Sequence, residues 1–129
     1  TAHIGDGALV ARNMADQKWH TISQPENGEY ASTTYFVTDV GVPRMRIGEW
    51  AEDIDAIFVF SDGIENLVFD NITREPFEGF FKPMMKPFAS SETLGRDHYL
   101  SERLSTYLNG AKFAELTDDD KTLIIAVRK

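Results

Sequence analysis

Aspartates lie next to the two most apolar segments of the chain, one after the first segment and three before the second. Asp62 follows the run 56–60 within Ser-Asp-Gly, and three consecutive aspartates at 118–120 precede the run 123–127. If the two runs are antiparallel neighbours, the end of one strand and the start of the other share an edge of the sheet, so the carboxylates converge. Converging carboxylates repel each other unless a cation lies between them, and Mg²⁺ and Mn²⁺ prefer such oxygen ligands. The spacing alone also fits two ordinary solvated turns.

Asp6 is a third candidate, because it lies within a segment that reads as a strand. In an extended strand over residues 3–12 it shares one face with Ile4, Ala8 and Val10, which is otherwise an apolar stripe. Burying a polar group without a partner costs roughly 2–7 kcal/mol, and burying a charge costs more. We therefore expect Asp6 to be paired, hydrogen-bonded, metal-bound or exposed at a bend.

The hydropathy pattern predicts strands first, helices later and one strand at the end. Runs rich in β-branched and aromatic residues predict six strands. They cover residues 3–12, 19–23, 34–38, 45–50, 55–60 and 121–127. The continuous apolar character of 56–60 and 123–127 is typical of central strands covered on both faces, which predicts a sheet packed against other layers.

Helices are predicted in the second half of the chain. Leucines recur on one face between residues 91 and 109, with Ser90 or Ser91 as the cap at the start and Asn109-Gly110 as a left-handed stop at the end. The stretch 69–88 is less regular, and its phenylalanines suit a short helix that packs into the core. Together the elements predict a single α+β unit.

Length and charge exclude several classes of protein. The chain has 129 residues, and 13 Lys+Arg against 21 Asp+Glu give a net charge of −8. Nucleic-acid affinity comes mostly from Lys and Arg, so a nucleic-acid partner is not expected. With no cysteine there is no disulfide, zinc–thiolate site or cysteine nucleophile, and we expect a reducing, cytoplasmic location. No segment approaches the roughly 18 apolar residues of a membrane span, so no membrane partner is expected.

Four sequence blocks follow one another in a characteristic order. They are Ile-Gly-Asp-Gly at 4–7, Pro-Glu-Asn-Gly-Glu-Tyr-Ala at 25–31, Ile-Phe-Val-Phe-Ser-Asp-Gly-Ile at 57–64 and Thr-Asp-Asp-Asp-Lys-Thr-Leu-Ile at 117–124. In this order they resemble the second half of a metal-dependent protein phosphatase of the PP2C type, particularly its bacterial-like branch. The resemblance spans nearly the whole chain. It implies a portion of an α-β-β-α sandwich, in which helices flank antiparallel sheets.

The resemblance also implies roles for individual residues. Asp62 and Asp119 correspond to metal ligands of the family, and Asp6 matches an aspartate that helps some members to hold a third ion. The chain departs from the family at Asn66, where an aspartate is frequent. The family holds two or more Mg²⁺ or Mn²⁺ ions and hydrolyses phosphoserine and phosphothreonine in proteins with a metal-activated water, which needs no nucleophilic side chain.

Two parts of the family pattern have no counterpart in this chain. They are an Asp-Gly-rich motif whose aspartate bridges the metals and an upstream basic residue that contacts phosphate. We therefore expect residues 1–129 to be the C-terminal half of a phosphatase domain, with little or no turnover in isolation. Uncovered apolar strands could then favour self-association, and the partner of the intact domain would be a phosphoprotein. The alternative is a phosphatase-like binding or regulatory module without catalysis.

Overall fold

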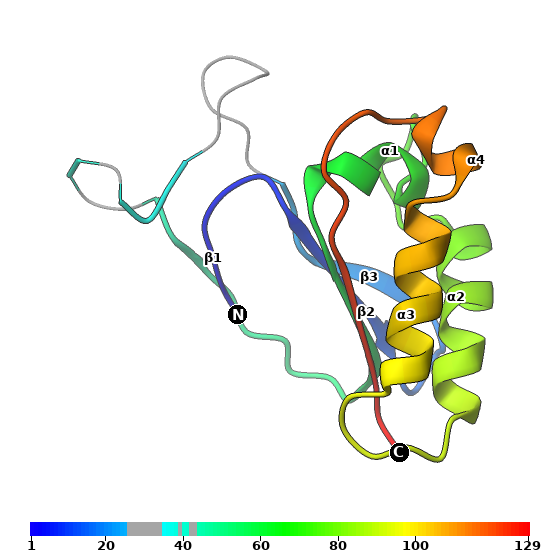
Figure 1. Cartoon of the computed structure of the whole chain (residues 1–129). Helices are drawn as coiled ribbons and strands as arrows, with labels where there is room; N and C mark the ends of the chain where they lie inside the picture. Colours follow the sequence, from blue (N-terminus) through cyan, green and yellow to red (C-terminus); the bar gives the residue numbers. More distant parts are fainter. Residues whose placement is uncertain (26–34, 39, 42–43) are drawn as a thin grey trace.

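A four-stranded antiparallel sheet forms the centre of the computed structural model, which describes residues 1–25, 35–38, 40, 41 and 44–129. The strand order is β3-β2-β5-β6, and β6 is an edge strand. The bounds are Ala8–Asn13 for β2, Trp19–Ser23 for β3, Ile54–Phe60 for β5 and Leu123–Val127 for β6. Helices α2 (Glu78–Ser90) and α3 (His98–Leu108) lie on one side of this sheet (Figure 1).

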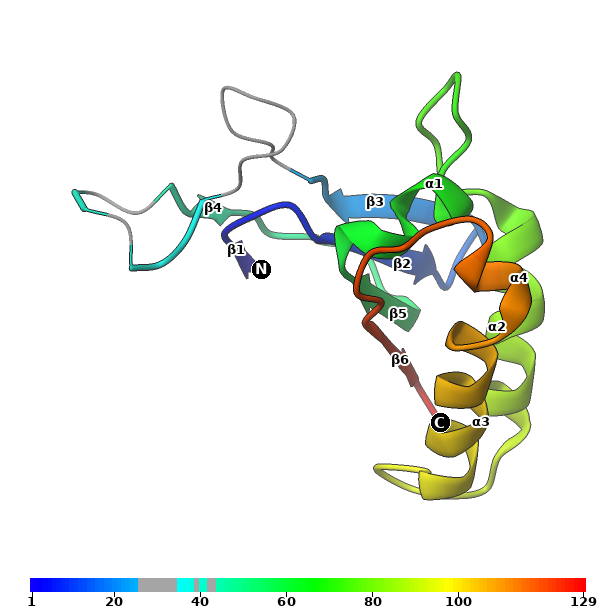
Figure 2. The same ribbon diagram turned by 45° about the horizontal axis from the view of Figure 1, so that its top comes forward.

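The smaller elements lie at the ends of the sheet. Strand β1 (Ala2–His3) pairs with β4 (Arg46–Ile47) in a separate two-stranded ribbon. The 3₁₀ helix η1 (Asp62–Ile64) and helix α1 (Glu65–Val68) follow β5 directly, and α4 (Ala111–Ala114) follows α3. Figure 2 shows the segment from α4 to β6 arching past α1 at one end of the sheet. No helix of the described residues has the length and apolar character needed to cross a membrane.

The core lies between the sheet and α2. Val10, Phe58 and Ile125 are cross-strand neighbours on the covered face. Phe81 of α2 is fully buried against them, with its ring centroid 5.1 Å from that of Phe58 and 5.0 Å from that of Trp19. Aromatic pairs in such edge-on and stacked arrangements add stability beyond the area that they bury. This cluster therefore fixes α2 on the sheet.

The opposite face of the sheet is more open. Leu9, Val59 and Ile124 lie opposite one another there, and 37% of Val59 and 58% of Ile124 is exposed. Among the described residues no helix covers this face (Figures 1 and 2). The prediction that residues 56–60 and 123–127 are covered on both faces is therefore wrong here. An apolar run shows which residues favour burial, but another segment must pack on them before they are buried.

The predicted strands at 19–23 and 55–60 are confirmed, and the predicted strand at 121–127 begins two residues later, at Leu123. The single strand expected over residues 3–12 is wrong, because the chain bends between β1 and β2. Gly5 has a φ of 98°, a left-handed conformation that an extended strand does not contain. A Cβ at Gly7 would lie 2.9 Å from the carbonyl oxygen of Phe60, so this position also needs glycine.

Two other strand predictions fare less well. The strand expected at 45–50 shrinks to the two residues of β4, because only this part finds a partner, in β1. Residues 35–38 of the strand expected at 34–38 form no strand; they include a turn at Val37 and Thr38. Residue 34 and most of the sequence block at 25–31 lie outside the described residues.

Both helix predictions need correction. The helix expected at 91–109 begins only at His98, because Gly95 has a φ of 79° and Asp97 caps the helix by accepting a hydrogen bond from the Leu100 amide at 3.0 Å. Its end is close to the prediction, but Gly110 has a φ of −69° and starts α4 rather than forming a left-handed stop. The helix expected within 69–88 is present as α2, but it begins only at Glu78, continues to Ser90 and has 13 residues, with two prolines on its exposed side.

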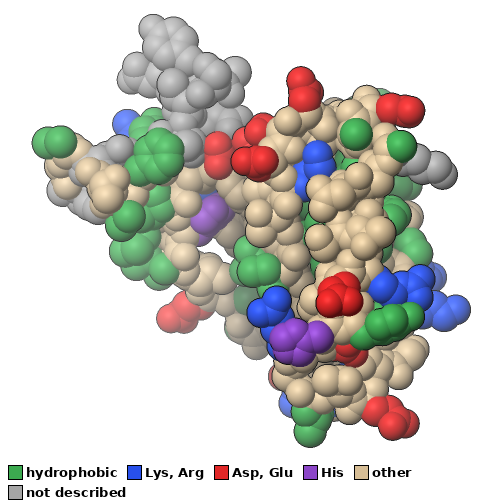
Figure 3. Space-filling view, viewed as in Figure 1, with side chains coloured by type: hydrophobic (Ala, Val, Ile, Leu, Met, Phe, Trp, Pro, Cys, Tyr) green, Lys and Arg blue, Asp and Glu red, His purple; other side chains and the backbone are tan. Residues whose placement is uncertain are grey.

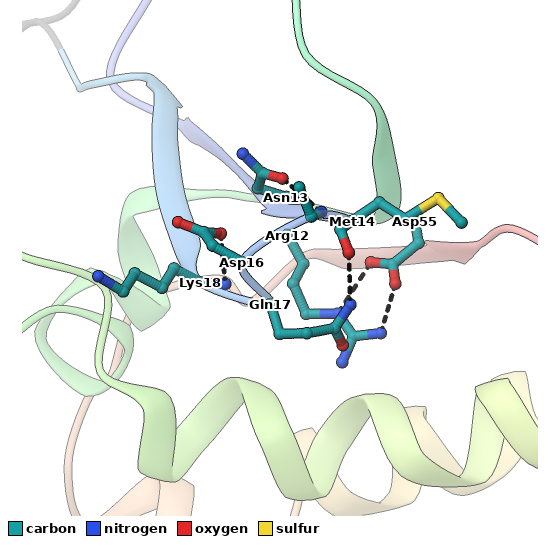
Figure 4. Close-up of polar contacts among 8 residues, drawn as sticks. Arg12, Asn13, Met14, Asp16, Gln17, Lys18 and Asp55 are labelled. Carbon is teal, nitrogen blue, oxygen red and sulfur yellow. Dashed lines mark hydrogen bonds and ion pairs between the residues drawn. The ribbon is translucent and has the colours of Figure 1, made fainter.

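A tight hairpin and an ion pair close the end of the sheet away from η1 (Figure 4). Gln17 has a φ of 61° in the β2–β3 turn, and its side-chain amide donates to the carbonyl of Met14 at 2.8 Å. Arg12 of β2 binds Asp55 of β5 through two hydrogen bonds, of 2.8 and 2.6 Å. Both partners are largely buried, so this bidentate pair helps to hold the register of the two strands.

Candidate functional site

Three segments that are far apart in the sequence meet at the other end of the sheet. Strands β5 and β6 are antiparallel neighbours, as expected, with Phe60 opposite Leu123. Asp62 therefore begins η1 beside the turn that contains Asp119. The bend with Asp6 lies next to them, because β2 begins at Ala8 opposite Phe60. Figure 3 shows acidic side chains on this face of the molecule. We call this edge the acidic rim and define it by Asp62 and by the two aspartates whose charges act on it, Asp6 and Asp119.

The acidic rim is held together mainly by backbone contacts. The Ser61 amide donates to the carbonyl of Thr122 at 3.2 Å, which extends the β5–β6 pairing by one step. A Cβ built on Gly63 would collide with the carbonyl oxygen of Asp120 and lie 3.4 Å from the Cβ of Asp119. The turn before β6 therefore packs directly on the Asp62–Gly63 segment. Only glycine permits so close an approach of the two chains.

The three carboxylates influence one another electrostatically. The pKa of Asp62 is raised above its ordinary value, first by partial desolvation and then by the negative charges of Asp6 and Asp119, although backbone hydrogen bonds oppose the shift. The repulsive part of this shift indicates that Asp6 and Asp119 both lie near the Asp62 carboxylate. A cation there would relieve this repulsion.

Asp6 lies half-buried at a bend between β1 and β2, which is closest to the last of the four environments expected for it, and not buried on a strand face. The bend is fastened by Arg46, whose Nη2 donates to the carbonyl of Gly5 at 3.1 Å. The same Nη2 lies 2.9 Å from Nδ1 of His3, which is 2.6 Å from the hydroxyl of Ser23. The sequence pattern pointed to none of these three contacts, because they join residues 20 to 43 positions apart.

The other residues of the turn and of η1–α1 have simpler surroundings. Asp118, Asp120 and Asn66 are exposed. The Asp120 amide donates to Oδ1 of Asp119 at 3.0 Å, a local contact that orients the Asp119 carboxylate. Among the described residues no group of three or more His, Cys, Asp and Glu side chains is arranged so as to hold a metal ion. The acidic rim therefore brings carboxylates together without forming a complete cage in this chain.

A separate groove of about 820 Å³ lies between α3 and β6. Its lining includes Leu100 and Leu104 of α3 and Ile125 of β6, but none of the three carboxylates of the acidic rim. The groove lies where α3 and the edge strand β6 face each other without close packing, so apolar side chains of both elements line it. The groove is therefore separate from the acidic rim, which remains the candidate site.

The chain thus combines an α+β fold with carboxylates at one end of its antiparallel sheet. Comparison with known proteins gives the class to which it belongs. The chain belongs to the protein phosphatase 2C family, whose profile matches residues 1–109. It is 32% identical over 128 residues to serine/threonine-protein phosphatase 3 of Escherichia coli (strain K12), in a match that covers 96% of this chain and 48% of the relative. The chain thus spans about half the length of that relative. No solved structure matched the chain significantly.

The electrostatics of Asp62 give a first testable prediction. Because its pKa is raised in the folded chain, the folded state holds a proton on this group more tightly than the unfolded state does. Ionised Asp62 therefore destabilises the fold at neutral pH, and this penalty disappears as the pH falls through the ordinary range of a carboxyl group. In EDTA, Asp62→Asn should raise the melting temperature at pH ~7 and change it little at pH ~3, because both states of the wild type are then protonated.

Asp118→Asn is the matched control for this experiment, because it removes the same charge from an exposed neighbour that does not act on Asp62. Thermal unfolding followed by circular dichroism over this pH range makes the comparison. An equal rise in melting temperature for both variants would trace the effect to net charge instead of the acidic rim.

Proposed function

We propose that the intact protein is a metal-dependent phosphatase of phosphoserine and phosphothreonine in proteins. The single observation that carries the proposal is that Asp6 and Asp119 lie near Asp62 at one rim. The sequence resemblance to the family implies that Asp62 and Asp119 are metal ligands. Family membership and the similarity to an E. coli serine/threonine-protein phosphatase support the reaction class. The substrate would be a phosphoprotein.

The donor set at the acidic rim fits Mg²⁺ or Mn²⁺ in its chemistry. All three side chains offer hard carboxylate oxygens. The raised pKa of Asp62 comes first from partial desolvation and then from the charges of Asp6 and Asp119, and a divalent cation would relieve the second of these. The set is incomplete in number, since the described residues form no closed group of three. We propose that Asp62 and Asp119 each supply a ligand, that Asp6 contributes to a further ion, and that the remaining ligands come from the part of the family domain beyond residues 1–129.

The residues of this chain would hold and shape the site. When bound, the ions would activate water and neutralise charge on the phosphate. Asp62 occupies the first position of η1, two residues after the buried residue Phe60, which holds its backbone at the rim. Arg46 fastens the bend that carries Asp6. No side chain of the rim is required as a nucleophile in this scheme.

An assay of the complete protein tests the proposal. With Mn²⁺ we expect release of phosphate from phosphothreonine and phosphoserine peptides, its loss in EDTA and its return when Mn²⁺ is added in excess. The isolated 129-residue chain should show little or no turnover under the same conditions. Hydrolysis that persists in EDTA would rule out the metal-dependent mechanism. Failure of the complete protein to bind Mn²⁺ in calorimetry would favour the alternative, a non-catalytic binding or regulatory module. The presence of Asn66 where the family frequently has an aspartate supports this alternative.

A further inference from the structure

We propose that Ser61 is a positioning residue, whose hydroxyl sets the spacing between the carboxylates of Asp62 and Asp119. The inference rests on the proposed function, because this spacing matters to catalysis only if both aspartates bind metal. Its structural part, a side-chain link between two turns, is independent of that function and can be tested separately.

The hydroxyl of Ser61 joins the turn after β5 to the turn before β6. Its oxygen accepts a hydrogen bond from the Thr122 amide at 3.0 Å, and its O–H donates to the carbonyl of Asp120 at 3.1 Å. These bonds span 59 and 61 positions in the sequence. The residue immediately before Asp62 is thereby tied to Asp120 and Thr122, the first and third residues after Asp119.

Both bonds satisfy backbone groups that the sheet leaves without ladder partners. Strand β6 begins at Leu123, so the Thr122 amide and the Asp120 carbonyl lie before the regular β5–β6 pairing. A single group must act as donor and acceptor to serve both, and a hydroxyl can do this whereas a methyl group cannot. Threonine retains the hydroxyl, so Ser61→Thr is the conservative replacement.

The two neighbours of Asp62 contact the same turn. Ser61 binds it through the hydroxyl, and Gly63 lies so close that a Cβ would collide with the carbonyl of Asp120. The other contacts of the turn are local: the Asp119 amide donates to the Thr117 hydroxyl at 3.2 Å, and Lys121 Nζ donates to the Asp119 carbonyl at 3.2 Å. Local bonds shape the turn but do not fix its distance from Asp62. That distance is set by the backbone bond from the Ser61 amide to the Thr122 carbonyl, by the Ser61 hydroxyl and by the close contact at Gly63, and of these the hydroxyl is the one that reaches the Asp120 carbonyl with a hydrogen bond.

Amide hydrogen exchange in the 129-residue chain tests the link itself. In Ser61→Ala we expect exchange at Thr122 to accelerate by about fivefold, since a hydrogen bond contributes about 1 kcal/mol and 1.4 kcal/mol corresponds to a factor of ten. Amides of β2 and β5 should keep their protection, because Ser61 is only half-buried and lies outside the core. Ser61→Thr should restore protection at Thr122. Ser90→Ala, which removes a hydroxyl bonded to Lys86 in α2, is the matched control.

Unchanged exchange at Thr122 in Ser61→Ala would overturn the proposal. Equal loss of protection throughout the sheet would overturn it as well, because Ser61 would then act on global stability and not on the turn.

Paramagnetic broadening by Mn²⁺ tests the consequence for the carboxylates. In the wild-type chain, low concentrations of Mn²⁺ should broaden the amide signals of Gly63 and Asp120 together. In Ser61→Ala the two signals should require several-fold more Mn²⁺, and Ser61→Thr should restore the wild-type concentration. Equal sensitivity of Ser61→Ala and wild type would show that the link does not position the carboxylates.

The two measurements separate the inference from the function on which it rests. If Mn²⁺ broadens neither signal in the wild type, the metal-ligand assignment loses its support in this chain. The positioning of metal ligands by Ser61 is then wrong too, while the exchange at Thr122 still decides whether the link exists.

Discussion

Asp119→Asn should lower the kcat/KM of the complete protein, assayed with Mn²⁺ on a phosphothreonine peptide, by at least about 100-fold. Loss of a group that merely orients a metal ligand commonly costs 10–100-fold, so loss of a ligand itself should cost at least the upper end of that range. Asparagine keeps the size of the side chain but removes the charge that acts on Asp62. The fold should therefore survive while the acidic rim loses affinity for the cation.

Asp118→Asn provides the control, because it changes the same charge in the same exposed turn at a residue that matches no ligand of the family. We expect its kcat/KM to stay within about threefold of wild type, as exposed charges contribute little once salt screens them. Titration of activity with Mn²⁺ should show a higher half-saturating concentration for Asp119→Asn alone. Activity of Asp119→Asn equal to that of the wild type would remove Asp119 from the site.

Phe81→Ala should give the largest loss of stability, about 3–5 kcal/mol in the free energy of unfolding of the 129-residue chain. Phe81 is fully buried, and its ring contacts those of Trp19, Phe58, Phe60 and Phe80. Its removal leaves a cavity between α2 and the sheet that the surrounding rings cannot fill. Domains of this size are stable by only about 5–15 kcal/mol, so the variant should keep only a small free energy of unfolding if the wild type lies near the lower end of that range.

Urea unfolding followed by tryptophan fluorescence measures this loss, since Trp19 stacks on Phe81. Phe77→Ala is the matched control: Phe77 precedes α2, and 54% of its surface is exposed. We expect this control to lose less than about 1 kcal/mol, as exposed positions usually do. Similar losses in both variants would mean that Phe81 does not anchor α2.

The parts of the fold that could be predicted are those in which local pattern and environment agree. The apolar runs that became β5 and β6 are unbroken and β-branched, so few other structures could accommodate them. The start of α3 was predicted seven residues too early, because apolar spacing suggested a helix where Gly95 and the cap at Asp97 stop one. The bend at Gly5 was missed for the same reason: strand-like residues on both sides concealed a backbone that only glycine readily adopts.

The candidate site divides in a similar way. Asp62 and Asp119 could be found because each adjoins a strong strand, and strand ends converge whenever the strands are antiparallel neighbours. The contacts of Ser61 with Asp120 and Thr122, and of Arg46 with Gly5, could not be predicted from the sequence. Each joins a side chain to a distant backbone group, and backbone groups are the same at every position of the sequence.

The sequence by itself determined the phosphatase family, the acidic candidates and the strands that carry them, because these follow from residue types at short range. Only the tertiary structure decided which carboxylates meet and what holds them together. It placed Asp6 half-buried at a bend, brought the turn at Asp119 against Gly63 and left one sheet face open. The physical reason is that hydrogen bonds and close backbone contacts between distant segments depend on how the strands pair, and pairing is a property of the folded chain as a whole.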